Sequence, residues 1–174
     1  MDHEPQHPCA RCAAMQKTCC QRAEILVTTG DRARIAAVVG RDDFSERRVP
    51  KDPAYFEVDP ADPEWPSLTI AADRTRAVLK RRADGDCTFL GERGCVLDEA
   101  TRPLVCRIYP FTYNHAGITT EDPDYCPTAM LRPPAGSMAT LLAMSRAKAE
   151  AWRSTLYREL RADRANAVAA EVTP

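Results

Sequence analysis

Residues 9–20 read CARCAAMQKTCC and hold four of the chain's eight cysteines within twelve residues. Cys9 and Cys12 form a CxxC pair, and Cys19 and Cys20 are adjacent. In a CxxC turn two sulfurs can converge on one metal ion, because metal–sulfur bonds are only about 2.3 Å long. Adjacent cysteines bond each other only with strain, so Cys19 and Cys20 are expected to face different partners. This polar segment offers thiols little apolar surface, which favours metal ligation over packing.

The other four cysteines are spread over residues 87–126. Turn residues at 84–85 and 91–94 bracket the strand-like segment 87–90, and a hairpin there would bring its cysteine close to the next one. Arg102-Pro103 opens a short turn or helix that presents the third. For each of these four, burial in the core is a real alternative to ligation. The predicted metal ligands are Cys9, Cys12, Cys19, Cys20, Cys87, Cys95, Cys106 and Cys126.

The two sets of cysteines are expected to share at least one metal centre. CxxC supplies only two of the four ligands that a closed centre needs, and the second set contains no CxxC of its own. A shared centre would close a long loop and stabilise the fold as a cross-link does. Because sites of four cysteines hold both kinds of cofactor, ligand type leaves an iron–sulfur cluster and zinc open.

Length, charge and apolar content indicate what kind of protein carries these thiols. A length of 174 residues suits one compact unit with appendages. The 24 basic and 25 acidic residues give a net charge of -1, so the usual electrostatic reason to expect nucleic acid or an anionic membrane as partner is missing. Residues 1–8 lack the apolar stretch of a secretory signal, and no run approaches the ~20 apolar residues of a membrane span. We expect a soluble cytoplasmic protein, in which thiols serve metal binding more often than disulfides.

The pattern between the cysteines predicts the α+β class, as a small, irregular, metal-stapled domain with short hairpin strands. After the first cysteine set, Thr29-Gly30-Asp31 is expected to cap a helix that Gly40 ends. Prolines disfavour regular structure over residues 44–66, which are expected to form an extended surface loop. Short strands are predicted at residues 24–28, 68–70 and 77–79.

The C-terminal part is expected to be helical. From Ser137 to about Val168 apolar residues recur at helical spacing, which predicts one amphipathic helix. The predicted division is a cysteine-cluster domain at 1–132, carrying the proline-rich insertion 44–66, and a C-terminal helix and tail at 133–174. Packing of the helix on its own domain is expected, with weak self-association left open.

The histidines are expected to be spectators. His3 and His7 lie in a proline-bearing tail, and His115 lies in a polar loop. Arginines near the cysteines, among them Arg102 and Arg107, are expected to be solvated unless they approach the sulfurs, where they would stabilise the thiolates.

Five segments together resemble the cysteine-cluster proteins of YkgJ type, a family with a zinc- or iron-chelating domain. They are CARCAAMQKTCC at 9–20, TTGDRARIA at 28–36, CTFL at 87–90, GCVL at 94–97 and RPLVCRIYPF at 102–111. The resemblance covers about residues 9–126 and implies metal binding by the clustered thiols. It extends to the cysteine region of flagellin lysine N-methylases, which implies an iron–sulfur cluster such as 4Fe–4S. Ala13 and the loop AAMQKT depart from the family pattern, so the metal's identity does not transfer.

The resulting hypothesis is a metal-binding protein whose clustered thiolates hold an iron–sulfur cluster, or zinc, in a structural or electron-transfer role, with the methylase resemblance favouring iron–sulfur. The alternatives are a metal-dependent enzyme, redox or methyl-transferring, and a zinc-stapled module that binds a protein partner. The sequence contains no GxGxxG nucleotide loop and no evident acid/base pair, so no catalytic residue is assigned.

Overall fold

The computed structural model describes residues 11, 14, 19–121 and 137–172. Its helices there are α2 (Cys19–Arg22), α3 (Thr29–Val39), α4 (Trp65–Thr69), α5 (Leu104–Ile108), α7 (Met138–Leu141) and α8 (Arg146–Val172), with a 3-10 turn η1 (Pro53–Phe56). The strands are β1 (Ser45–Arg48), β2 (Arg76–Leu79), β3 (Leu90–Gly91), β4 (Gly94–Cys95), β5 (Phe111–Asn114) and β6 (Gly117–Glu121). This mixture confirms the α+β class. None of the described helices is long and apolar enough to cross a bilayer.

Helix α3 is the helix predicted after the first cysteine segment. Thr28 caps it, because the threonine hydroxyl accepts a hydrogen bond from the Asp31 N–H at 2.9 Å and the Asp31 carboxylate accepts one from the Thr28 N–H at 3.2 Å. Gly40 ends it at φ 69, a conformation that glycine adopts without a Cβ clash. The cap therefore lies one residue before the predicted stretch, and the stop is where the sequence predicts it.

The strands form three separate antiparallel pairs, β1–β2, β3–β4 and β5–β6. In the first, Ser45 is opposite Leu79, and in the second, Leu90 is opposite Cys95. Leu26 makes one isolated bridge with Val78 of β2. The strand predicted at 24–28 is therefore only an extended segment beside β2.

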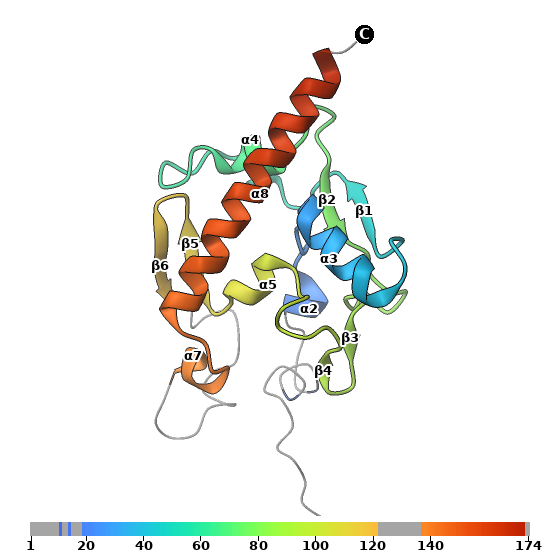
Figure 1. Ribbon diagram of the computed structural model, residues 1–174, viewed down its shortest axis with the longest axis vertical. Coiled ribbons are helices and arrows are strands. Elements are labelled where there is room, and N and C mark those ends of the chain that lie inside the picture. The colour runs from blue at the N-terminus through green and yellow to red at the C-terminus, as the bar shows by residue number, and fades with distance from the viewer. Residues whose placement is uncertain (1–10, 12–13, 15–18, 122–136, 173–174) are drawn as a thin grey trace, which may run out of the picture.

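Helix α8 runs diagonally through the view of Figure 1, and α5 lies beside it and contacts it. Its buried residues Ala149, Leu156 and Leu160 belong to the same core cluster as Leu104 and Ile108 of α5. A second core cluster gathers α3, the segment before it and the β3–β4 region, with the members Ile25, Val27, Ile35, Phe44, Leu79, Cys87, Phe89, Leu90 and Leu97.

Three further local predictions were wrong. Residues 68–70 largely belong to helix α4, where Pro66 occupies the first turn, a position that suits proline because its missing N–H has no helical partner. The region 44–66 contains β1, since its residues pair with β2. The C-terminal helix is confirmed as α8, but it begins at Arg146, because the chain breaks after α7 at Ala143, which has φ 52.

Candidate functional site

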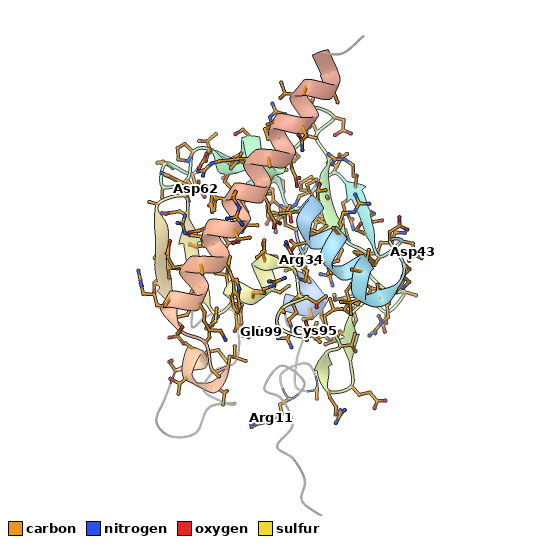
Figure 2. All side chains as sticks on the ribbon, viewed as in Figure 1. Arg11, Arg34, Asp43, Asp62, Cys95 and Glu99 are labelled. Atoms are coloured by element: carbon orange, nitrogen blue, oxygen red, sulfur yellow. The ribbon has the colours of Figure 1, made fainter. Side chains whose placement is uncertain are left out.

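Four cysteines from distant parts of the chain surround one cavity. Cys20 lies in α2, Cys87 follows the turn after β2, Cys95 ends β4, and Cys106 lies in α5. All four line a cavity of about 290 Å³. Figure 2 shows Cys95 close to the region where α2, α5 and the β3–β4 hairpin meet. The fold thus brings one thiol of the first predicted set to three of the second.

Backbone contacts hold Cys20 beside Cys87. The Cys87 N–H donates to the Cys20 carbonyl at 2.7 Å. Arg81 donates to the same carbonyl at 3.1 Å and to the Gly85 carbonyl at 2.7 Å, and it also bonds the Ala23 carbonyl. Arg81 therefore ties the end of α2 to the turn that precedes Cys87. The sequence does not indicate this role, because Arg81 lies within the basic run Lys80-Arg81-Arg82 and the side chains of such runs are usually solvated.

Hydrogen-bond donors point at two of the sulfurs. The Phe89 backbone donates to the Cys87 sulfur, and the Leu97 backbone donates to the Cys95 sulfur. The Arg102 side chain also donates to the Cys95 sulfur. Such donors stabilise thiolates and tune the metals that thiolates bind. Arg102 therefore lies next to a sulfur. In that position an arginine is expected to stabilise the thiolate.

Cys106 is held through the short helix α5. The Leu104 N–H at its start donates to the buried Asp31 carboxylate at 3.1 Å. Arg107 donates to the Arg102 carbonyl at 2.6 Å. A helix of five residues has little stability of its own, so these contacts and the packing on α8 fix the sulfur.

Burial and the neighbouring thiols raise the pKa values of Cys87, Cys95 and Cys106. Burial raises the pKa of Cys87 to about 11, where Cys20 and Cys95 add to the effect and the Phe89 backbone and Arg81 oppose it. Burial likewise raises the pKa of Cys95, and that of Cys106 well above its ordinary value, with Cys20 contributing in both cases. Four neighbouring thiolates without a cation are therefore unfavourable, and a bound metal would offset both the burial and the repulsion.

The four thiols suit a thiophilic metal such as zinc or iron. Around tetrahedral zinc, sulfurs lie ~3.8 Å apart, as follows from bonds of about 2.3 Å. In the described part of the chain, no three of the four sulfurs lie within 4.8 Å of one another.

The remaining predicted ligands lie outside what the structure describes. This applies to Cys9, Cys12 and Cys126, and to the side chain of Cys19, whose backbone begins α2. The spectators His3 and His7 and the boundary at 132–133 also fall outside the described residues.

His115 is exposed and lies away from the cysteines. Its Nδ1 is 3.3 Å from Asp62 Oδ1, and with Glu64 these residues form a group of potential ligand atoms. The Glu64 carboxylate already pairs with Arg161. In the view of Figure 2, Asp62 and Cys95 lie on opposite sides of α8.

Fold and site together define a small α+β protein built around a cysteine-lined cavity. A family model described as "CxxCxxCC: Putative zinc- or iron-chelating domain" matches residues 8–127, and the chain belongs to this family. The family description indicates a zinc- or iron-chelating function. All eight predicted cysteine ligands lie within the matched residues. No curated protein and no solved structure gives a significant match.

Proposed function

We propose that this chain is an iron–sulfur protein, in which Cys20, Cys87, Cys95 and Cys106 are the thiolates of one centre. Cys9, Cys12, Cys19 and Cys126 are further ligands of that centre or of a second one. The observation that carries the proposal is the cavity, where thiols from both cysteine sets meet and no three of the four described sulfurs lie within 4.8 Å of one another. Zinc is the alternative, because it suits the same donor type.

The surroundings of the sulfurs support a centre that carries charge. Backbone N–H groups donate to two sulfurs, and the cations Arg81 and Arg102 act on Cys87 and Cys95. Hydrogen bonds and positive charge near the sulfurs raise the reduction potential of an iron–sulfur cluster. We assign the centre an electron-transferring or structural role in the cytoplasm.

The deciding experiment is anaerobic purification of the full chain with analysis of iron, zinc and acid-labile sulfide. We expect iron and sulfide in equal amounts, visible charge-transfer absorbance, and an electron paramagnetic resonance signal after reduction or oxidation. Stoichiometric zinc without sulfide would overturn the iron–sulfur assignment and leave the chelating function intact.

Single cysteine variants test the shared centre. Cys20→Ser, Cys87→Ser and Cys106→Ser should each lower bound iron and sulfide, because each removes a thiolate from the same centre. His115→Ala is the control and should retain the wild-type complement. If Cys20→Ser keeps full iron and an unchanged spectrum while Cys87→Ser loses both, Cys20 is not a thiolate of the centre to which Cys87 belongs, and the proposed ligand set is wrong.

A further inference from the structure

Charged and aromatic side chains also line the cavity of the cysteines, and binding of a metal by the thiols does not require them. Its lining includes Arg76, Glu24, Tyr55, Trp65 and Tyr113, together with aliphatic residues. At about 290 Å³ it lies near the lower end of the ~300–1,000 Å³ typical of small-molecule pockets. The charges of Cys106 and of Arg76 both affect the pKa of the Tyr113 hydroxyl. Tyr113 is therefore a common neighbour of a cavity cysteine and of the arginine.

Arg76 is a buried cation that makes no direct ion pair within the described residues, although the charge of the Glu24 carboxylate acts on it. The residue is 3% exposed, and its Nε and Nη1 atoms have no hydrogen-bond partner. Nη2 donates to the Glu24 carbonyl at 3.5 Å, and the guanidinium lies 4.1 Å from the Tyr55 ring centre and interacts with the Tyr55 hydroxyl. No carboxylate in the described residues pairs with it. Buried arginines are normally paired, because an unpaired buried charge is costly.

The nearest candidate for a partner is already engaged elsewhere. Arg48 lies directly opposite Arg76 in the β1–β2 pair. The Glu24 carboxylate, which lines the same cavity, pairs with Arg48 at 3.2 Å. Arg48 also approaches the more exposed Glu46 at 3.5 Å. Glu24 is thus the direct ion-pair partner of Arg48, and its charge reaches Arg76 without forming an ion pair.

We propose that the cavity binds a small organic monocarboxylate with an apolar or aromatic body, and that Arg76 binds its carboxylate group. The carboxylate would accept hydrogen bonds from the guanidinium, and Trp65, Tyr113 and Tyr55 would contact the body. This ligand would lie beside the cysteines, so the metal centre and the ligand would share one cavity. The inference does not depend on which metal the thiols hold.

The cavity walls favour a single negative charge. Arg76 and Arg102 both line the cavity, but Arg102 acts on Cys95, which leaves Arg76 as the arginine for a ligand. Glu24 on the same lining would repel a second negative charge on that ligand. A phosphate dianion would therefore be partly uncompensated, whereas a monocarboxylate matches the charge of Arg76. The cysteine centre has other cations, since Arg81 and Arg102 act on the thiols.

Binding of phenylacetate to the metal-loaded full chain tests the proposal, measured by isothermal titration calorimetry. Phenylacetamide, which has the same shape without the charge, and inorganic phosphate are the comparison probes. We expect saturable binding of phenylacetate only. Arg76→Met should weaken it about ten- to a hundredfold, as expected for a lost charge-assisted contact. Arg76→Lys keeps the charge with fewer donors and should give an intermediate affinity.

The matched control is Arg74→Met. Arg74 stacks on the Phe56 ring at 4.3 Å, is exposed and does not line the cavity, so its removal should leave phenylacetate binding unchanged. Metal content and cooperative thermal unfolding establish that each variant is folded. If Arg76→Met fails this check, the comparison rests on Arg76→Lys.

Three results would overturn the proposal. They are the absence of saturable phenylacetate binding by the wild type, binding of phenylacetamide or phosphate with equal affinity, and unchanged affinity in a folded Arg76 variant. Since the measurement requires only a metal-loaded chain, failure here leaves the iron–sulfur assignment untouched.

Discussion

Replacing Glu159 with glutamine should break the link between α8 and the start of α3. The Glu159 carboxylate accepts hydrogen bonds from Arg34 at 2.6 and 3.0 Å and from the Thr28 hydroxyl at 2.5 Å. Thr28 is the cap of α3, so one side chain of α8 engages the end of another helix. Glutamine has the same shape as glutamate, but it offers only one acceptor oxygen. Its NH2 group would face Arg34 or the Thr28 hydroxyl, which now donate to the second carboxylate oxygen.

The expected cost at neutral pH is about 1–2 kcal/mol of unfolding free energy. Hydrogen bonds to charged groups contribute about 1.5–3 kcal/mol. We take the lower part of that range because the Arg34 side chain is 32% exposed and keeps its pair with Asp31. Urea denaturation of the metal-loaded wild type and variant measures the difference.

The difference should depend on pH in one direction. Burial alone would raise the pKa of Glu159, but the hydrogen bonds from Arg34 and Thr28 outweigh it and hold the pKa below 4.5. A carboxyl group whose pKa is lower in the folded state stabilises the fold above its unfolded pKa. The wild-type advantage should therefore stay constant from about pH 8 to pH 5 and shrink as the pH falls below about 4.5.

The control is the Arg41–Asp43 pair, which is on the surface and 2.6 Å long. Figure 2 shows Asp43 at the outer edge of the molecule and Arg34 near its middle. Asp43→Asn should leave stability unchanged, because surface pairs are screened by water. If Glu159→Gln costs no more than Asp43→Asn, the contacts of Glu159 do not stabilise the fold.

Other predictions follow from the core and from the site. Leu156→Ala should cost about 3–5 kcal/mol, because Leu156 is 0% exposed, whereas Val168→Ala at an exposed position of α8 should be near neutral by urea denaturation. Removing the metal with a chelator should lower the midpoint of thermal unfolding, and equal midpoints for the two forms would contradict a metal-stapled fold. Arg81→Met should lower bound metal, measured by elemental analysis, while Arg82→Met, at a more exposed neighbour, should not.

The sequence predicted those parts of the fold that depend on neighbours in the chain. Thr28 with Asp31 and Gly40 define a helix by local hydrogen bonding and backbone conformation, and the structure contains that helix. The break at Ala143 could not be predicted this way, since the apolar spacing continues through it. The wrong strand at 68–70 has the same origin, because a short apolar run does not distinguish a strand from a helical turn.

For the site, the sequence identified the residue type but not the surroundings. Cysteine spacing indicated ligands, and the structure gathers Cys20, Cys87, Cys95 and Cys106, which is the juxtaposition that a shared centre requires. Arg81 and Arg76 were missed, since a basic residue in a run or at a strand end usually points to solvent. Their roles arise from long-range contacts, to α2 for one and to a buried cavity for the other.

The position of α5 connects the metal site to the stability of the whole domain. Leu104 and Ile108 face the α8 cluster, while Cys106 lines the cavity and Val105 packs against both core clusters. Because α5 is too short to hold its shape alone, displacement of α8 would also displace the Cys106 sulfur. A ligand that binds only the folded state stabilises that state, so a metal held by Cys106 would strengthen the docking of α8. By the same linkage, losses in the α8 core should weaken metal retention although they lie outside the cysteine-lined cavity.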